Sequence, residues 1–133
     1  MVEQASKVTL TSRAFHNTQL GVFGEYLTKL MGYDKFLPMN GGCEADETAC
    51  KLVRRWAYRV KGIKDNEAVI LFPTGNFWGR SITASGACDD PSRYTHFGPF
   101  TAGFELFKYD NIPDLEAKLK KNPNIAAIFV EPI

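Results

Sequence analysis

Two uninterrupted apolar runs constrain the fold of this chain more than any other feature. Residues 68–72 read Ala-Val-Ile-Leu-Phe, and residues 125–130 read Ile-Ala-Ala-Ile-Phe-Val. A strand with one face in water alternates polar and apolar side chains, and neither run shows that alternation. Such runs are typical of strands buried on both faces, as in a parallel sheet covered by helices. They predict an α/β protein with a mostly parallel sheet and flanking helices.

Periodicity and helix-ending residues predict the elements around these strands. Apolar residues at helical spacing predict helices over about 19–31, 43–61 and 113–121, and a shorter apolar stretch predicts a strand over about 104–109. No internal repeat, low-complexity tract or Gly/Ser-rich linker interrupts the chain. We therefore expect residues 1–133 to form a single piece of one domain.

The first candidate site is the glycine pair that opens the 43–61 helix. Gly41 and Gly42 precede Cys43, and a helix start offers unpaired N–H groups and the positive end of the helix dipole. Glycines also let a phosphate group approach the backbone closely. The alternative is a flexible entry turn without a ligand, because the segment has neither the lysine nor the spacing of the common phosphate-binding loops.

The second candidate site is segment 74–80, Thr-Gly-Asn-Phe-Trp-Gly-Arg, which directly follows the 68–72 strand and Pro73. Ligands of open α/β sheets bind beyond the carboxyl ends of the strands. Phe77 and Trp78 could provide a stacking surface, and Arg80 could bind a carboxylate. The alternative is that the two aromatic residues belong to the core and that Arg80 is a surface charge.

Charge and residue usage argue against several other functions. Sixteen basic and fifteen acidic residues leave a net charge of +1, so a nucleic-acid partner is not expected. No apolar run approaches the roughly 20 residues of a membrane-spanning helix, and no targeting signal is recognisable. Three cysteines without metal-type spacing predict neither a metal site nor a disulfide framework. His16 and His96 have no companion at a known catalytic spacing.

Five short motifs follow one another along the chain: Gly-Tyr-Asp-Lys-Phe-Leu-Pro-Met-Asn (32–40), Glu-Ala-Asp-Glu-Thr-Ala-Cys-Lys-Leu (44–52), Gly-Asn-Phe-Trp-Gly-Arg (75–80), Phe-Gly-Pro-Phe (97–100) and Val-Glu-Pro-Ile (130–133). In this order they resemble the ornithine aminotransferases. That family belongs to the ω-amino-acid subgroup, class III, of the pyridoxal-phosphate-dependent aminotransferases, which have the aspartate aminotransferase fold. The likeness extends from about Val8 to Ile133 and implies the N-terminal part of the large, cofactor-binding domain.

The resemblance implies pyridoxal 5′-phosphate as the cofactor. The backbone N–H groups of Gly42 and Cys43 match the positions that hold the cofactor phosphate at the helix start. Phe77 matches the aromatic residue that stacks on the pyridine ring, and Glu131 matches an acidic residue close to the cofactor. These roles agree with the chemistry of the residues, because they place an anion at a helix dipole and a ring against a ring.

The resemblance also implies the substrates. Trp78 matches a residue that lines the substrate pocket, and Arg80 matches one that binds a substrate carboxylate. The implied reaction transfers the δ-amino group of ornithine to 2-oxoglutarate and yields glutamate and glutamate semialdehyde, which cyclises to pyrroline-5-carboxylate. Many relatives, such as the acetylornithine aminotransferases, have His where Trp78 stands. A relative that acts on acetylornithine or 4-aminobutyrate is the alternative.

The chain departs from the family pattern in ways that affect activity. The family's Schiff-base lysine follows the Val-Glu-Pro-Ile motif, so no catalytic residue is assigned and these 133 residues alone are expected to be inactive. Gly41 replaces the Thr or Ser of most relatives, which removes one possible phosphate donor. A non-catalytic binding or interaction module that keeps the front half of the fold is an alternative of a different class.

Assembly and localisation are expected by the same resemblance. Family members are dimers with shared active sites, and a partial parallel sheet exposes an unpaired edge, so we expect a homodimer or higher oligomer. The expected ligands are a small amino acid and a 2-oxo acid, with no nucleic acid and no membrane. The animal enzymes are mitochondrial and some protist relatives are cytosolic, so the mitochondrial matrix is expected, with the cytoplasm as the alternative.

Overall fold

The computed structural model describes residues 1–12 and 14–132, which form two compact units. The first unit comprises Met1–Pro38 and the second begins at Met39. Arg13 and Ile133, the last residue of the Val-Glu-Pro-Ile motif, lie outside the described residues. The expectation that residues 1–133 form a single piece of one domain stays a prediction. The division falls in a segment that has no linker composition, so the sequence carries no compositional signal of it.

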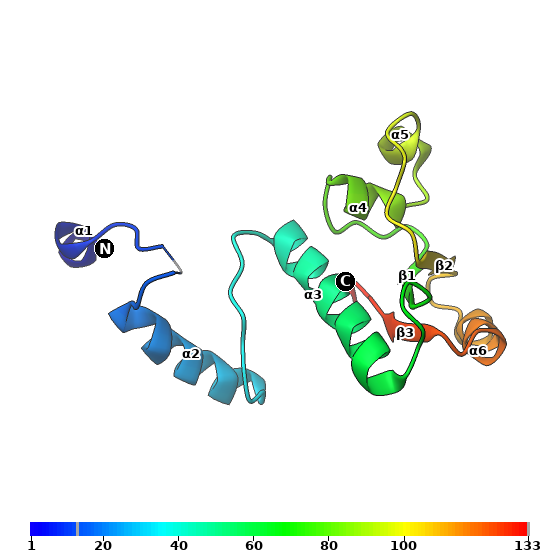
Figure 1. The fold of residues 1–133 in the computed structure, drawn as a ribbon. Helices are drawn as coiled ribbons and strands as arrows, with labels where there is room; N and C mark the ends of the chain where they lie inside the picture. The colour runs from blue at the N-terminus through cyan, green and yellow to red at the C-terminus, as the bar shows by residue number, and fades with distance from the viewer. Residues whose placement is uncertain (13, 133) are drawn as a thin grey trace. The chain divides into compact units, whose positions relative to one another are not determined.

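Figure 1 shows the helices and strands in chain order. Their bounds are α1 Val2–Lys7, α2 Thr18–Met31, α3 Gly42–Trp56, η1 Ala57–Lys61, β1 Val69–Pro73, α4 Ile82–Gly86, α5 Pro91–Tyr94, β2 Phe104–Phe107, α6 Ile112–Lys121 and β3 Ile125–Ile128. The helices predicted over 19–31 and 113–121 correspond to α2 and α6. The short helices α1, α4 and α5 have no counterpart among the predicted elements, because four to six residues are too few for a periodic pattern.

In the first unit, local capping defines α2. The Asn17 side chain accepts hydrogen bonds from the N–H groups of Gln19 and Leu20, at 2.8 and 3.2 Å. Gly32 ends the helix in the left-handed conformation with φ of 72°, which glycine adopts without steric cost. The Phe36 side chain packs closely against the helix at Gly24. This unit therefore consists of a well-capped helix with a returning segment beside it.

The second unit contains a three-stranded parallel sheet with the strand order β2-β1-β3. Ile70 of the central strand pairs with Phe104 on one side and with Ala127 on the other. All residues of β1 after Val69 are buried. The α/β class with a parallel sheet and flanking helices, predicted from the apolar runs, is confirmed.

Helices cover both faces of β1, which explains its continuous apolar run (Figure 1). Ile70 and Phe72 pack against Cys50 of α3 on one face. Leu71 points to the opposite face, where Leu115 of α6 joins its cluster. Each such side chain contributes about 1.5–3 kcal/mol when it is fully buried. With both faces covered, only the ends of the strands remain available for polar chemistry.

The helix predicted over 43–61 differs from the structure in its last turn. The α-helix ends at Trp56 and continues as the π-helical turn η1, after which Gly62 has a φ of 79°. The wider turn buries Ala57 and lets its carbonyl oxygen accept a hydrogen bond from the Ile63 N–H, at 3.0 Å. Ala57 and Ile63 then pack with Ala68 in a separate cluster. The π turn therefore coincides with the packing of Ala57 and Ile63 against Ala68, just before β1.

Strands β2 and β3 each end two residues before the predicted strands, 104–109 and 125–130. At the end of β2, the Lys108 N–H donates to the Asp114 carboxylate at 2.8 Å. The Tyr109 N–H donates to a threonine hydroxyl in the loop after β1, at 3.1 Å. Side-chain oxygens thus accept the hydrogen bonds of the two N–H groups that follow β2, in place of a neighbouring strand. These groups lie at the carboxyl end of the strands, where ligands of such sheets bind.

Candidate functional site

The start of α3 presents backbone N–H groups without a side-chain cap. Gly41 is the N-cap residue, in an extended conformation, and no side chain in the described part of the chain accepts a hydrogen bond there. Gly42 is exposed and Cys43 is half-buried. The Glu44 carboxylate already lies close to this terminus, since its Oε2 atom would be 2.9 Å from a Cβ atom at Gly41. An anion bound here gains from the helix dipole but must displace or avoid Glu44.

The loop after β1 lies directly against this helix start. A Cβ atom on Gly79 would overlap the Cys43 Sγ atom and lie 2.8 Å from the Cys43 Cβ atom. Beyond it, the Cys43 thiol lies 3.6 Å from the Ser81 hydroxyl, which in turn donates to the Glu47 carboxylate. The two candidate sites predicted from the sequence are therefore neighbours.

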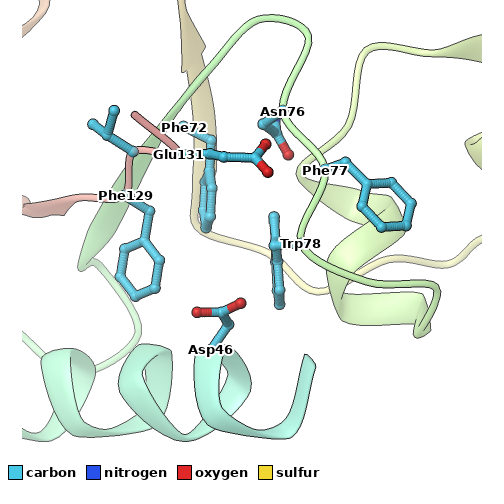
Figure 2. Close-up of a pocket in the computed structure, with 8 residues that line it drawn as sticks. Asp46, Phe72, Asn76, Phe77, Trp78, Phe129 and Glu131 are labelled. Carbon is cyan, nitrogen blue, oxygen red and sulfur yellow. The ribbon is translucent and has the colours of Figure 1, made fainter. Parts of the chain in front are cut away.

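A cavity of about 170 Å³ opens between α3, this loop and the segment after β3. Figure 2 shows the Asp46 side chain reaching it from α3 and the Glu131 side chain from the segment that follows β3. Its lining consists of aromatic side chains, two carboxylates, an amide and one aliphatic side chain: Asp46, Phe72, Asn76, Phe77, Trp78, Phe129, Val130 and Glu131. The cavity thus lies beyond the carboxyl ends of β1 and β3.

Two buried polar atoms of the cavity lining have no hydrogen-bond partner among the described residues. Asn76 is only 6% exposed, and its Nδ2 atom donates to the carbonyl oxygens of Pro73 and Ala87, at 2.8 and 2.6 Å. The Asn76 Oδ1 and Trp78 Nε1 atoms have no hydrogen-bond partner within residues 1–12 and 14–132. An unsatisfied buried polar atom costs about 1–3 kcal/mol, so this pair makes the cavity suited to a polar ligand or water.

The two adjacent aromatic residues of the loop face in different directions. The Trp78 ring stacks on the Phe72 ring, with centroids 5.4 Å apart and planes 9° apart. The Phe77 ring points away from them (Figure 2), and the residue is 43% exposed. Trp78 therefore combines a core contact with a place in the cavity lining, whereas Phe77 offers an exposed aromatic surface.

Two arginine side chains flank the exposed ring. The guanidinium carbons of Arg80 and Arg93 lie 5.4 and 5.1 Å from the centroid of Phe77. Both arginines also line a second, larger cavity of about 440 Å³, together with apolar groups such as Ile82 and Phe97. Within residues 1–12 and 14–132, no acidic side chain forms an ion pair with Arg80. That guanidinium is free to bind a carboxylate.

Three of the predicted site residues meet in the first cavity, namely Phe77, Trp78 and Glu131. Glu131 is exposed, and its carbonyl oxygen accepts a hydrogen bond from the Tyr109 hydroxyl at 3.4 Å. The N-terminal residues of α3 do not line this cavity, although they contact the loop that does. Arg80 belongs to the second cavity. The predicted residues therefore belong to one region with two cavities, which are lined by consecutive stretches of the same loop.

Two polar residues of the first cavity, Asn76 and Asp46, were not among the predicted site residues, and neither were the apolar lining residues Phe72, Phe129 and Val130. Asn76 stands between a glycine and two aromatic residues. A polar residue in this position was the sequence signal that could have marked it as a site residue. Asp46 resembles the other acidic residues at a helix start. Its position in the lining is visible only in the structure, where burial raises the pKa of its carboxyl group above the ordinary 3.8.

These features fit a phosphorylated heteroaromatic cofactor of the pyridoxal phosphate type. A cavity of about 150 Å³ accepts a benzene ring, and the first cavity has a similar size and aromatic walls. Asn76 Oδ1 can accept a hydrogen bond and Trp78 Nε1 can donate one to polar ring substituents. The uncapped N–H groups of α3 suit a phosphate.

Among the described residues, no group of histidine, cysteine or acidic side chains is arranged to hold a metal ion. No helix in the described part of the chain has the length and apolar character needed to cross a bilayer.

Comparison with known proteins finds close relatives. Mitochondrial ornithine aminotransferase of Drosophila ananassae is 56% identical over 133 residues, which is 100% of this chain and 31% of that protein. A structure of the Toxoplasma gondii ornithine aminotransferase, described as having partial occupancy of PLP at the active site, superposes with a TM-score of 0.95. It is 47% identical and covers 99% of this chain and 31% of that one.

An acetylornithine aminotransferase structure from Elizabethkingia anophelis is 52% identical, with a TM-score of 0.78, and covers 99% of this chain and 31% of its own. The chain thus spans about a third of the length of these relatives. The resemblance to the ornithine aminotransferases is confirmed. The family described as aminotransferase class-III matches residues 1–133. This chain belongs to the class-III aminotransferases.

Proposed function

We propose that this chain supplies the cofactor-binding region of an ornithine δ-aminotransferase that uses pyridoxal 5′-phosphate. The observation that carries the proposal is the aromatic cavity with two unpaired buried polar atoms, next to an uncapped helix start. Close relatives that are named ornithine aminotransferases support the choice of reaction.

On this proposal, four residues hold the cofactor. The N–H groups of Gly42 and Cys43 bind the phosphate at the positive end of the α3 dipole. The exposed ring of Phe77 stacks against the pyridine ring. Glu131 lines the first cavity, as Phe77 does. Its carboxylate orients the cofactor ring by contacting polar groups on that ring. The loop contact between Cys43 and Gly79 keeps the phosphate and ring subsites at a constant separation.

Two residues act on the substrates. Arg80, which forms no ion pair among the described residues, binds a substrate carboxylate with its guanidinium fork. Trp78 forms a wall of the substrate pocket while its ring stays stacked on Phe72. Bound pyridoxal phosphate supplies the electron sink for transfer of the δ-amino group of ornithine to 2-oxoglutarate. The products are glutamate semialdehyde, which cyclises to pyrroline-5-carboxylate, and glutamate.

We further propose that the 133 residues alone do not catalyse the reaction. A lysine must move the proton in such chemistry, and none of the described lysines lines either of the two cavities. These residues then retain non-covalent binding of the cofactor without catalysis. Glutamate formation from ornithine and 2-oxoglutarate by this chain with added pyridoxal phosphate would contradict this part of the proposal.

A related amine specificity is the second candidate. The similarity to an acetylornithine aminotransferase, at 52% identity, favours it. The size of the amine substrate distinguishes ornithine specificity from the related specificity, because Trp78 forms a wall of the substrate pocket and limits the space for the amine. Calorimetric titrations with ornithine, N-acetylornithine and 4-aminobutyrate distinguish the candidates. We expect ornithine to bind most tightly, and a preference for N-acetylornithine would establish the second candidate.

Assembly and localisation follow the same proposal. We propose a homodimer or higher oligomer, since the edges of a three-stranded sheet are unpaired. Light scattering tests this, and a monomer at all concentrations would contradict it. A mitochondrial location is proposed from the relative described as mitochondrial, with the cytoplasm as the alternative.

Cofactor binding is tested with pyridoxamine 5′-phosphate, which has no aldehyde and cannot react with surface lysines. Trp56 is 45% exposed, so a Trp56→Phe background leaves Trp78 as the fluorescent reporter. We expect saturable quenching of Trp78 fluorescence, which Phe77→Leu weakens. An unquenched Trp78 at saturating ligand would contradict the proposal.

A further inference from the structure

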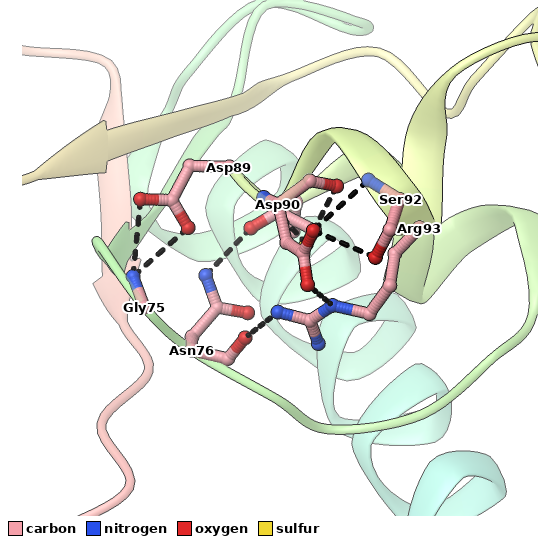
Figure 3. A network of polar contacts seen from close by, with 8 residues as sticks. Gly75, Asn76, Asp89, Asp90, Ser92 and Arg93 are labelled. Atoms are coloured by element: carbon pink, nitrogen blue, oxygen red, sulfur yellow. Dashed lines mark hydrogen bonds and ion pairs between the residues drawn. The ribbon is translucent and has the colours of Figure 1, made fainter.

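A second segment of the chain holds the loop after β1 in place. Figure 3 shows this network. The Gly75 N–H donates to both carboxylate oxygens of Asp89, at 2.9 and 3.1 Å. The Arg93 Nη2 atom donates to the Asn76 carbonyl oxygen at 3.0 Å. The backbone on the N-terminal side of Phe77 is thus tied to residues 89–93.

The Arg93 side chain is itself held on its other side. Its Nε atom donates to the Asp90 carboxylate at 3.2 Å. Asp90 is also the N-cap residue of α5 and accepts hydrogen bonds from the Ser92 N–H and hydroxyl groups, at 2.9 and 2.8 Å. The Arg93 side chain is only 25% exposed. A side chain with these contacts has little rotamer freedom left.

This restrained guanidinium lies against the Phe77 ring, with its carbon 5.1 Å from the ring centroid. A cation at this distance from an aromatic centroid is attracted to the ring. Arg93 therefore contacts the side chain of Phe77 and the carbonyl group of the preceding residue at the same time. These two contacts restrain both the backbone and the ring orientation at one position.

The two arginines beside Phe77 differ in what else they bind. Arg80 is exposed and makes no ion pair within the described residues, whereas Arg93 is half-buried and paired with Asp90. Of these two described arginines, Arg80 is therefore the one whose guanidinium has no carboxylate partner and is available for a substrate carboxylate. The contacts of Arg93 are directed at the protein, which is the arrangement expected of a residue that positions another side chain.

We propose that Arg93, oriented by Asp90, is a positioning residue that holds the Phe77 ring in the orientation in which the ring stacks on the cofactor. The inference rests on the proposed function for the stacking role of Phe77. It adds a division of roles, in which Arg80 binds substrate and Arg93 maintains the stacking surface.

A double-mutant cycle tests this proposal through the affinity for pyridoxamine 5′-phosphate. In the Trp56→Phe background, we expect Arg93→Gln to weaken binding about threefold to tenfold, the effect of losing a cation–ring contact. In a Phe77→Leu background the same substitution should change the affinity less than about twofold. Arg93→Lys, which keeps the cation without the fork, should recover part of the loss.

The control is Arg59→Gln, which removes an exposed arginine of η1 and should leave the affinity unchanged. An equal loss for Arg93→Gln with and without Phe77 would overturn the inference, because Arg93 would then act by another route. No loss in either background would overturn it as well. Asp90→Asn provides a second variant, expected to give a smaller loss that also depends on Phe77.

The unliganded chain separates this inference from the proposed function. If pyridoxamine 5′-phosphate does not bind the parent chain, the proposed function fails, and the NMR signals of the Phe77 ring still test Arg93. We expect Arg93→Gln to shift or broaden these signals and Arg59→Gln to leave them unchanged. Unchanged Phe77 ring signals in Arg93→Gln would overturn the positioning role.

Discussion

Cys43 at the start of α3 lies in direct contact with Gly79 in the loop after β1, and no side chain fits between them. A Cβ atom on Gly79 would overlap the Cys43 Sγ atom. The backbone φ of Gly79 is 156°, which residues with a side chain rarely adopt. This contact joins two parts of the candidate site that are 36 positions apart in the sequence.

We expect Gly79→Ala to lower the free energy of unfolding by about 2–4 kcal/mol, from backbone strain and overpacking together. Cys43→Ala alone should cost about 1 kcal/mol or less. In the double variant, removal of the sulfur should recover part of the lost unfolding free energy. The recovery should be incomplete, because the backbone strain at position 79 remains. Urea denaturation measures all three variants. Strictly additive effects would show that the two residues are not coupled.

The amide of Asn76 should be essential to the loop. Asn76→Asp replaces the amide nitrogen, which donates to the carbonyl groups of Pro73 and Ala87, by a carboxylate oxygen. We expect a loss of about 3 kcal/mol in unfolding free energy, from two lost donors and a buried charge. Asn66→Asp is the matched control at an exposed turn position, and it should change stability by less than about 0.5 kcal/mol. Similar effects of both changes would exclude a special role for Asn76.

The carboxyl group of Asp46 should make stability depend on pH. Burial raises its pKa above the ordinary 3.8, so the folded chain binds the proton more tightly than the unfolded chain. Ionised Asp46 therefore opposes folding above its folded pKa, and stability rises as the pH falls through that pKa towards 3.8. Asp46→Asn should be more stable than the parent chain at pH 7 and lose this advantage below pH 3.8. Thermal unfolding at several pH values measures the difference.

Asp90 should show the opposite sign. Hydrogen bonds from Ser92, with a smaller contribution from Arg93, hold the pKa of Asp90 below the ordinary 3.8. Its contribution to stability is therefore complete above pH 3.8 and is lost as the pH falls through the lower folded pKa. Asp90→Asn and Ser92→Ala should both reduce the loss of stability on acidification. An unchanged acid unfolding profile in both variants would contradict this account of Asp90.

The elements that could be predicted from the sequence are those whose burial or boundaries are visible in a short stretch of residues. The run at 68–72 has no polar position because α3 and α6 cover both faces of β1. The glycine pair at 41–42 marks a helix start because no side chain is needed there. Both features are local, so the sequence shows them directly.

The remaining features depend on contacts between distant residues. Phe77 and Trp78 are adjacent and similar, yet one faces out and the other stacks on Phe72, which the loop conformation decides. The partner of Phe77, Arg93, lies sixteen positions further on, in a helix of four residues that has no periodic signal. The π turn after α3 depends in the same way on packing against Ala68.

The central claim, that a phosphate binds at the start of α3, is tested most directly with Gly42→Pro. Gly42 is the first residue of the helix and follows an extended residue, so proline is compatible there and removes only the N–H donor. The measurement compares the affinities of pyridoxamine 5′-phosphate and pyridoxamine for both chains by fluorescence titration. Circular dichroism checks that the helix content is unchanged.

The parent chain should prefer the phosphorylated ligand. Gly42→Pro should weaken binding of pyridoxamine 5′-phosphate about tenfold, as expected for loss of one hydrogen bond to a charged group, and should leave pyridoxamine binding unchanged. Equal affinity of the parent chain for the two ligands, or an unaltered phosphate preference in Gly42→Pro, would contradict the claim.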